Sequence, residues 1–485
     1  MATRVTSQLF ARTAIHFNTI HGSALARAQR QISSGIRFEL PSEQPIEYRQ
    51  VRSLETRFTQ LEADQSVLQL TTATLNASVD QLQDANNIVT LAKSLVQQGI
   101  QAFDLDERNA LATEIDALLK QAETIGLAKF NGSFLFGGTR SDQPPFEFAP
   151  ARYENGLSEV TYLGTKQRSQ SHVGDSISID TYYTGEEVFG ATGRQSTVLV
   201  ETTGLGLGTG TDNLNGRATV QVRHTGTSYS GGSGVQAGTG SVGNDTVLGP
   251  LGKHQIQIND TSGTGASGTV SLNNGPEVAF SSTDTNLEIV DAQGRIVYLD
   301  TTTIVPGFSG TVNLATTGTL SIDEGATTIP IGYSASQRVV DSATGRFVTL
   351  DTSNVNRTGD DSLEFPGTSN LFQVLQATAD DLRNSRDLSN SEYGKALNRR
   401  LDELDRAASQ VFDVLGQQAS SLRTMQTIEE RVEDLKLSVE TRISDIQATD
   451  FPDAVVQLTN SQNLLQYTYA VTAQLTSLNL LQFLS

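Results

Sequence analysis

In one long segment in the first quarter of the chain, mostly apolar residues recur at alternating spacings of four and three residues. From Leu54 to Val96 this spacing holds over thirteen positions, and leucines such as Leu61, Leu68 and Leu75 recur along it. The period places these side chains on one side of an α-helix, so the pattern predicts a helix with a single packing seam. About 50 residues at ~1.5 Å each give a helix roughly 75 Å long, which needs a partner helix.

Proline, serine and glycine mark the ends of the predicted helices. Ser42 can cap the first amides of the long helix, and Pro45 stands in the first turn, where a missing N–H breaks no hydrogen bond. A second helix is predicted from Asp106 to Ile125, with Gly126 ending it.

A partner for the long helix is predicted near the other end of the chain. The same spacing of three and four residues recurs in two runs, which are Leu401, Leu404, Ala408, Val411 and Leu415, and then Ile428, Val432, Leu435, Val439, Ile443 and Ile446. Gly416 and residues 422–425 interrupt the register, which we interpret as a break or stutter in one long antiparallel helix. A shorter helix is predicted before it, from Leu371 to Leu388.

The middle of the chain, from Gly193 to Pro366, has a different character. Residues 201–340 hold 24 of the 42 glycines, which disfavours helix over most of this region. Short alternating runs predict strands instead, at residues 197–201, 219–223, 255–259, 296–300 and 347–351. The predicted fold class is therefore α+β and multidomain: a long antiparallel helical bundle or coiled coil built from both termini, with an inserted β-rich lobe of sandwich or barrel type.

Some of the predicted strands resemble one another. Residues 216–222 and 252–258 share a glycine and a basic residue followed at the same offset by an alternating apolar run, and residues 294–301 match residues 345–352. Duplication of one β unit and convergent strand-and-turn composition both explain such short matches.

The predicted order of segments is helix, β insert, helix. We expect an N-terminal core helix over 1–44, the first half of a helical rod over 45–192 with a β-hairpin near 134–165, and a β-rich lobe over 193–366. The second half of the rod follows over 367–449, and a C-terminal core helix over 450–485 pairs with residues 1–44.

Composition and charge exclude several functions. The chain of 485 residues has 34 basic and 54 acidic residues, a net charge of -20, so nucleic acid is an unfavourable partner. The chain has no cysteine, which removes disulfides, thiolate metal sites and a cysteine nucleophile. It shows neither the apolar core of a secretory signal nor a run of roughly 18 apolar residues that would insert in a membrane.

The two ends of the chain carry the features on which the functional prediction depends. Residues 454–485 hold no charged side chain, and the first 38 residues hold five arginines and no acid. A solvated helix normally carries charges, whereas a helix buried on all sides avoids them because removing an ion from water costs several kcal/mol. The predicted assembly interface consists of Leu25, Ala28, Ile32, Leu464, Val471, Leu475, Leu478 and Leu481. The alternative is a terminal coiled pair within a monomer.

Several motifs resemble those of flagellin-like axial proteins, especially the members at the hook-filament junction. Residues 31–37 (QISSGIR) followed by 41–45 (PSEQP) look like the N-terminal signature of that family, although Gln44 replaces one of its two usual acids. Residues 131–139 (NGSFLFGGT) resemble the turn into its β-hairpin, and residues 369–372 (SNLF) its helix restart. Residues 478–484 (LNLLQFL) are similar to its C-terminal tail. The insert 193–366 is not covered by the resemblance.

The resemblance implies a structural subunit of the bacterial flagellum that polymerises through its terminal helices and joins the hook to the filament. It implies as partners hook-associated protein 1, flagellin, further copies in a ring and an export chaperone, with no nucleic acid and no membrane insertion. The expected location is the extracellular flagellum, reached by type III export without a cleavable signal peptide. The alternatives are a flagellin filament subunit, or a stalked surface adhesin whose β-rich lobe binds a target.

No residue is predicted to carry catalysis, hold a metal or bind a cofactor, so the chain is not expected to be an enzyme. His16 and His21 are five residues apart and do not share a helix face as metal ligands would. Gly204 to Gly210 is interpreted as a flexible linker, because it lacks a phosphate loop's lysine. Asp104, Asp106 and Glu107 are expected to cap a helix rather than to bind calcium. His172, His224 and His254 receive no role.

Overall fold

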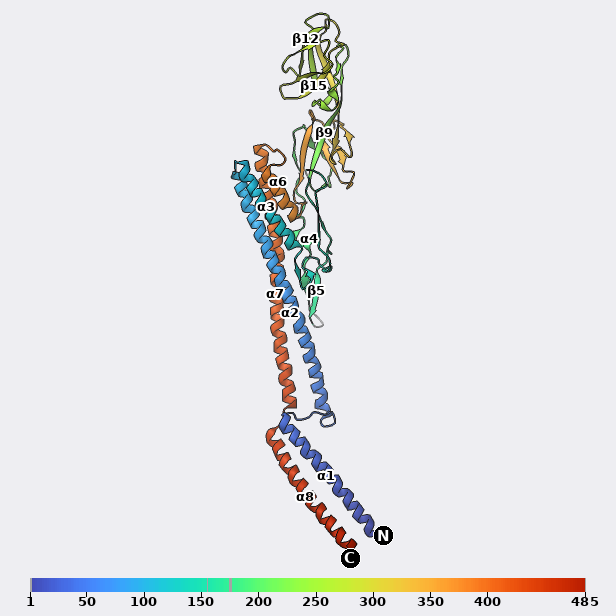
Figure 1. Ribbon diagram of the computed structural model, residues 1–485, viewed down its shortest axis with the longest axis vertical. Helices are drawn as coiled ribbons and strands as arrows, with labels where there is room; N and C mark the ends of the chain where they lie inside the picture. Colours follow the sequence, from blue (N-terminus) through green and yellow to red (C-terminus); the bar gives the residue numbers. More distant parts are fainter. Residues whose placement is uncertain (1, 155, 174–176, 485) are drawn as a thin grey trace. The chain divides into compact units, whose positions relative to one another are not determined.

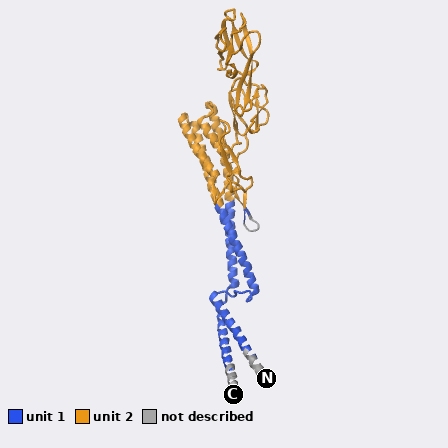
Figure 2. Ribbon diagram, turned by 45° about the vertical axis from the view of Figure 1, so that its right-hand side comes forward, with its two compact units in different colours: residues 1–73, 171–179, 421–485 blue, residues 74–170, 180–420 orange. Residues whose placement is uncertain are grey.

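The computed structural model describes residues 2–154, 156–173 and 177–484, and at 2–8, 10–11, 173, 177 and 475–484 it describes the backbone alone. The chain forms two compact units, which Figure 2 colours separately. Unit 1 contains residues 1–73, 171–179 and 421–485, and unit 2 contains residues 74–170 and 180–420. Two long helices pass from one unit into the other, so each unit is described by itself.

The helices run in chain order as α1 (Ala2–Ser34), α2 (Pro45–Gln101), α3 (Leu105–Gly126), α4 (Gly185–Phe189), α5 (Ser241–Asn244), α6 (Leu371–Arg383), α7 (Asn390–Gln447) and α8 (Phe451–Leu484). The strands before the predicted insert are β1 (Lys129–Phe130), β2 (Ser133–Phe134), β3 (Phe146–Ala149), β4 (Glu159–Tyr162), β5 (Ser169–Val173) and β6 (Ile177–Tyr182). The later strands are β7 (Val198–Val200), β8 (Gly206–Leu207), β9 (Gly216–Tyr229), β10 (Gln236–Ala237), β11 (Gly249–Asn259), β12 (Ser267–Leu272), β13 (Val278–Ser281), β14 (Leu287–Val290), β15 (Ile296–Asp300), β16 (Ser309–Ser321), β17 (Ile329–Pro330), β18 (Gln337–Val340), β19 (Phe347–Asp351) and β20 (Gly359–Phe365). Figure 1 shows that the long helices come from the two ends of the chain and the strands from its middle.

Helices α2 and α7 form the predicted antiparallel pair. Within unit 2, the amide of Gln418 donates to Ser78 (3.0 Å), and the Tyr393 hydroxyl donates to the carbonyl of Gly99 (3.2 Å). Within unit 1, the Lys436 ammonium donates to Gln65 (2.8 Å). Residue numbers rise along α2 as they fall along α7, which confirms the antiparallel prediction. The buried seam of α2 is Leu61, Leu68, Leu75, Leu82, Val89 and Val96, at the predicted spacing of seven residues.

The predicted stutter in α7 is wrong. The helix is continuous from Asn390 to Gln447, and Gly416 lies inside it. Its buried positions keep a spacing of seven residues through the suspected interruption, at Leu397, Leu404, Val411, Gln418, Met425 and Val432. The polar residue Gln418 occupies a core position, and its hydrogen bond to Ser78 supports it there. The series of apolar residues in the sequence is interrupted here, but the buried positions of α7 still recur every seven residues.

The predicted helix ends are partly correct. Helix α2 begins at Pro45, so Gln44 and not Ser42 occupies the capping position, because residues 41–43 still form a turn. Asp104 caps α3 by accepting from the backbone N–H of Asp106 (3.4 Å), as the sequence suggested. Helix α6 ends at Arg383, earlier than predicted, because Asn384 adopts a left-handed conformation that stops it.

The motif at residues 131–139 forms a tight turn in unit 2. Asn131 and Gly132 both have positive φ, 48° and 84°, and join β1 to β2 as the two central residues of a hairpin. The nearby β3–β4 hairpin packs its aromatic side chains on α6, where the rings of Phe146 and Phe372 are 5.1 Å apart. Asn370 caps α6 and Gln373 bonds back to it, which explains how residues 369–372 restart a helix.

The lobe contains the predicted strands, and most of them lie in one eight-stranded antiparallel sheet. Its order is β13-β12-β11-β16-β9-β20-β7, with β17 paired to β16. Two three-stranded sheets, β10-β15-β14 and β18-β19-β8, accompany it. The side chains between these sheets form two cores: one contains Ile256, Val270 and Leu314, and the other Val222, Leu320 and Leu363. The long strands β9 and β16 contribute to both cores, so the lobe is a pair of joined sandwiches.

The two sandwiches have the same topology. In sandwich A, residues 231–316, the sheets run β13-β12-β11-β16 and β10-β15-β14. In sandwich B, residues 201–224 and 317–365, they run β17-β16-β9-β20 and β8-β19-β18. The short strands match in register too, since Gln236 is opposite Asp300 and Gly206 is opposite Asp351. Sandwich A lies in the chain between two strands of sandwich B. Duplication of one β unit stays a hypothesis, and this shared topology favours it over convergent composition.

A cluster of buried ion pairs fixes the lobe to α6 and α7 within unit 2. Glu364 on β20 pairs with Arg386 (2.5 Å) and Arg400, and Asp381 on α6 pairs with Arg386 (2.6 Å) and with Arg217 of β9 (3.1 Å). The side chains of these residues are between 0% and 6% exposed. Burial raises the pKa of Glu364, but Arg400 and the other surrounding arginines lower it more, so the carboxyl stays ionised. Such a cluster needs every partner in place.

Candidate assembly interface

The terminal helices α1 and α8 of unit 1 pack against each other along one seam. On α1 a series of buried and half-buried residues recurs at spacings of four and three, at Ala14, Asn18, His21, Leu25, Ala28 and Ile32. On α8 the corresponding positions are Ala454, Leu458, Ser461, Leu465, Thr468 and Thr472. Small and uncharged polar residues fill much of this seam, so the two helices approach closely without burying a large apolar surface.

A second, apolar face of α8 remains exposed in the single chain. It contains Val456, Leu464, Tyr467 and Val471, which are 55%, 48%, 71% and 52% exposed. At 100° per residue these positions lie roughly 120° around the helix from the seam with α1. We call these four residues the outer face of α8. Because no charged side chain follows Asp453, nothing on this helix favours keeping that face in water.

Helix α1 shows exposed apolar side chains as well. Leu9 and Ile15 are each 64% exposed, and Phe17 and Ile20 are 46% and 43% exposed. These residues lie outside the seam that faces α8. Leu9, Phe17 and Ile20 fall within roughly 80° of one another around the helix, and exposed apolar side chains gathered in this way mark surfaces that become buried against another molecule.

The predicted interface residues therefore divide between two surfaces. Leu25, Ala28 and Ile32 lie in the seam between α1 and α8, where Ala28 is buried and the other two are half-buried. Leu464 and Val471 lie on the outer face of α8. The side chains of Leu475, Leu478 and Leu481 lie outside the described part of the chain. The prediction missed Val456 and Tyr467, although a helical wheel that separates two stripes on α8 would have found them.

The motif at residues 31–45 forms the elbow of unit 1, where α1 gives way to α2. There the chain crosses the link between α7 and α8 and pairs with it like a short β-bridge. The N–H of Arg37 donates to the carbonyl of Gln447 (2.7 Å), and the N–H of Thr449 donates to the carbonyl of Gly35 (3.0 Å). Gly35 has a φ of 73°, a left-handed conformation that favours glycine and ends α1. The motif thus ends α1 and ties the segment that follows it to the link between α7 and α8.

Glu43 is the charged centre of this elbow. Its carboxylate accepts from the backbone N–H of Glu39 (3.0 Å) and of Leu40 (3.5 Å), and it pairs with Arg27 (3.7 Å) and Arg30 (3.6 Å) of α1. Burial raises its pKa, but these two N–H groups and the two arginines lower it more, so the pKa is below its ordinary value. One acid therefore ties the elbow to α1, which explains why Gln44 can replace the second acid of the motif.

The other candidate sites do not form reaction centres. His224 lies 3.7 Å from Asp245, and its ring nitrogen bonds the Thr227 hydroxyl (2.8 Å), but the side chains of the histidine and the aspartate are fully buried. Burial lowers the pKa of His224, which keeps the ring neutral. Among the described residues no group of three or more His, Asp or Glu is arranged to hold a metal ion. This buried network supports the structure of the lobe.

The interpretation of Gly204 to Gly210 as a flexible linker is wrong. Leu205 is buried in a lobe core, and Gly206–Leu207 form β8, which pairs with β19. A side chain at Gly208 would lie 3.0 Å from the backbone of Leu350, so glycine is needed for this close approach. Glycine frequency in this stretch reflects tight packing and not freedom of the chain.

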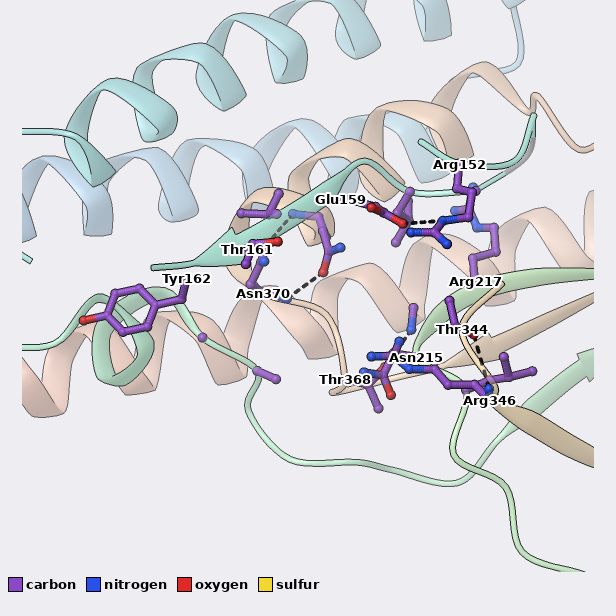
Figure 3. A pocket seen from close by; sticks show the side chains of 18 of the residues that line it. Arg152, Glu159, Thr161, Tyr162, Asn215, Arg217, Thr344, Arg346, Thr368 and Asn370 are labelled. Atoms are coloured by element: carbon purple, nitrogen blue, oxygen red, sulfur yellow. Dashed lines mark hydrogen bonds and ion pairs between the residues drawn. The ribbon is translucent and has the colours of Figure 1, made fainter. Parts of the chain in front are cut away.

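Unit 2 contains a cavity of about 680 Å³, shown in Figure 3. It lies between the β3–β4 hairpin, the start of β9 and the β18–β19 turn. Several of the charged groups that line it are already paired, such as Arg152 with Glu159 (2.7 Å) and Arg217 with Asp381. The Tyr153 hydroxyl donates to Asp341 (2.8 Å). The bond from Tyr153 connects the loop of the hairpin to sandwich B.

None of the helices in the described residues has a stretch long and apolar enough to cross a membrane.

Comparison with known proteins gives matches at both ends of the chain. The family model described as "Bacterial flagellin N-terminal helical region" matches residues 5–141, and "Bacterial flagellin C-terminal helical region" matches residues 400–484. Flagellar hook-associated protein 3 of Salmonella typhimurium is 28% identical over 153 residues, which cover 30% of this chain. The match spans 48% of that relative, about half its length.

Similar solved structures include the flagellar junction protein FlgL from Legionella pneumophila and FlgL from Xanthomonas campestris. The protein from Legionella pneumophila is 16% identical with a TM-score of 0.40, covering 81% of this chain and 99% of that one. The protein from Xanthomonas campestris is 15% identical with a TM-score of 0.39 and the same coverage of both chains.

Proposed function

Because the chain belongs to the flagellin family, we propose that it is a structural subunit of the bacterial flagellum that occupies the junction between hook and filament. The family matches lie over α1 to α3 and over α7 and α8, the helices that carry the candidate interface. The relative named hook-associated protein 3 supports the junction over other positions in the flagellum.

The observation that carries this proposal is the outer face of α8. Val456, Leu464, Tyr467 and Val471 are each about half exposed or more, on a helix that has no charged residue after Asp453. Burying a Val or Leu side chain contributes ~1.5–3 kcal/mol, so covering this face with neighbouring helices stabilises an assembly. A protein that worked alone would gain nothing by leaving it open.

The proposed partners follow from the position at the junction. Further copies would cover the outer face of α8 in a ring, with hook-associated protein 1 on the hook side and flagellin on the filament side. An export chaperone would bind the terminal segments before assembly. The chain would act outside the cell as a flagellar component, and it would act by packing and without catalysis.

Deletion of the gene followed by complementation tests the proposal. We expect cells without the protein to keep their hooks, lose their filaments and release flagellin into the medium. Wild-type chain should restore filaments, whereas a Leu464→Lys, Val471→Lys variant should not, because it places two charges in the proposed contact. Val242→Lys is the matched control, since Val242 is 72% exposed in the lobe.

Filaments that stay attached in the deletion strain would overturn the junction proposal. Growth of long filaments from the purified chain alone would instead assign it to the filament. Restoration by the doubly charged variant would show that the outer face of α8 is not a contact surface.

A further inference from the structure

Helix α7 has an acidic face in unit 1 that is separate from the outer face of α8. Its members are Glu429, Glu430, Glu433, Leu437 and Glu440, which we call the acidic face. At 100° per residue they fall roughly 60–160° around the helix from the buried position Val432. Leu437 lies among the carboxylates and is 64% exposed. Such an apolar side chain within a charged rim is typical of a contact surface.

Nothing within the described part of the chain neutralises this face. None of the ion pairs recorded there involves its four glutamates, and the nearest base, Lys436, pairs instead with Glu62 (3.7 Å) and donates to Gln65. Arg431 and Arg442 lie roughly 160–180° around the helix from Glu433 and Glu440. Four like charges on about three turns repel one another, which disfavours the face unless a partner supplies the opposite charge.

Helix α2 carries a face of the opposite sign in the same unit. At 100° per residue, Arg49 lies opposite the seam with α7, and Arg52 and Arg57 lie on either side of Arg49. Thr56 lies between these arginines. We call these four residues the basic face. The Arg52 side chain is 66% exposed. Among the residues that the structure describes, these arginines bond only residues of their own helix: Arg52 pairs with Glu55 (2.9 Å), and Arg57 donates to Gln60 (3.3 Å). All three remain available for contact with another molecule.

The acidic and basic faces cannot meet within one chain. The bond between Lys436 and Gln65 holds the seams of α2 and α7 together, so both faces point away from the pair. With helix axes about 8–10 Å apart and side chains pointing outward, the two faces are separated by roughly 20 Å. A copy of the chain therefore presents two complementary surfaces on opposite sides, an arrangement that joins copies head to tail around a closed ring.

We infer that the acidic face of α7 docks on the basic face of α2 of a second copy, and that this contact sets which copies become neighbours. The inference rests on the proposed assembly of the chain and adds a surface to it. Each exposed ion pair contributes only ~0.2–1 kcal/mol, so the contact contributes mainly specificity and speed of association. The apolar outer face of α8 would supply most of the affinity.

Salt dependence follows from the same physics. Ions screen exposed charges over about 8 Å at physiological ionic strength, so the docking should weaken as salt rises. Burial of apolar side chains on α8 responds little to moderate salt. The two contributions can therefore be separated in one preparation of the full-length protein.

Engineered cysteines test the contact directly, because the chain has no cysteine of its own. We replace Thr56→Cys and Leu437→Cys in one chain, which leaves every charge unchanged. Disulfides need Cα atoms within about 7 Å, so the pair cannot close inside one copy. Flagella isolated from cells that carry this variant should give a ladder of covalent oligomers after oxidation. The pair Thr90→Cys and Leu437→Cys is the control and should give no ladder.

Charge reversal tests the same contact without a cross-link. Changing Glu430, Glu433 and Glu440 to Lys should slow association of the purified chain at least about tenfold at low salt. Changing Arg49, Arg52 and Arg57 to Glu should do the same, and mixing the two variants should restore association. Asp142→Lys, Glu147→Lys, Glu277→Lys is the control with equal charge change, and it should associate like the wild type.

The outcomes separate this inference from the proposed function. Suppose that filaments still require the gene, but that the cysteine pair gives no covalent oligomers and neither charge reversal slows association. This result would overturn the docking and leave the junction role intact. Filaments that persist in the deletion strain would overturn the junction role. A third outcome is that the cysteine pair gives covalent oligomers but that mixing the two charge-reversed variants does not restore association. The two faces would then lie close together without pairing their charges, which would reject the electrostatic basis of the inference.

Discussion

The β lobe and the terminal helix pair bury their apolar side chains to different degrees. In the lobe, residues such as Ile256, Leu320 and Leu363 are completely buried, and two cores are closed by strands of the same chain. In the terminal pair, Leu464 and Val471 remain about half exposed. In the lobe, residues of the same chain bury the apolar side chains. In the terminal pair they leave some of these side chains exposed, and this is the region proposed to assemble with other subunits.

Breaking the ion cluster should lower the free energy of unfolding more than any other change considered below, and it should destabilise the lobe. Arg400→Met leaves Glu364, Glu403 and Asp381 buried without one of their cations. We expect a loss of about 3–5 kcal/mol, because an unpaired buried charge keeps its full desolvation cost. Urea unfolding followed by the intrinsic fluorescence of tyrosines measures it. Arg346→Met is the control, since that side chain is exposed. Equal midpoints for both variants would rule out a structural role for the cluster.

Truncating one apolar side chain in each region tests the comparison itself. Ile256→Ala should lower the free energy of unfolding by about 2–5 kcal/mol, since it opens a cavity in a closed core. Leu464→Ala should change monomer stability by less than about 0.5 kcal/mol and should impair filament attachment instead. Thermal unfolding of both variants, beside a motility assay, gives the two readouts. Strong destabilisation of the monomer by Leu464→Ala would show that α8 is complete without neighbours.

The matching topology of the two sandwiches predicts matching costs at equivalent positions. Gly204 and Gly234 have φ values of 90° and 80°, and a side chain at either would lie within 2.4 Å of a backbone oxygen. Substitution by Ala should cost about 1–3 kcal/mol at both sites. Gly231→Ala, where nothing lies within 4 Å, is the control. Thermal unfolding checks all three variants, and a cost at only one site would argue against equivalence of the sandwiches.

Periodic features of this fold were predictable from sequence, and features that depend on contacts far apart in the chain were not. The seam of α2 and the strands of the lobe repeat a local period, which the order of residues reveals directly. The ion cluster joins Arg217 to Asp381, 164 residues away, and no local signal connects them. The strand at Gly206–Leu207 was missed because only its pairing with β19 makes it a strand.

The candidate interface shows the same limit. Absence of charge in α8 predicted that the helix is covered, and its apolar period located Leu464 and Val471. The sequence could not divide the stripe between the seam with α1 and the outer face, because that division depends on how α1 lies against α8. The elbow motif was recognised by resemblance, but the role of Glu43 follows only from its contacts with Arg27 and Arg30.

Acid should loosen the elbow of unit 1 by a small amount. The pKa of Glu43 in the folded chain lies below its ordinary value of 4.5, so the ionised carboxylate stabilises the elbow. This contribution is complete above about pH 4.5 and is lost as the pH falls through the lowered pKa. We expect about 0.5–1 kcal/mol, the range of a partly exposed ion pair. Hydrogen exchange at the amides of Glu39 and Leu40 measures the loss, because both donate to this carboxylate.

A charge-neutral variant completes this last experiment. Glu43→Gln should show weaker protection of the same two amides at neutral pH and little further change on acidification, because the titrating group is gone. Glu39→Gln is the control, since it removes a neighbouring charge that makes none of these contacts through its side chain. Protection that falls with pH equally in the wild type and in Glu43→Gln would mean that another group controls the elbow. In that case the charge of Glu43 would not stabilise the elbow. The terminal pair and the lobe would then differ only in how far their apolar side chains are buried.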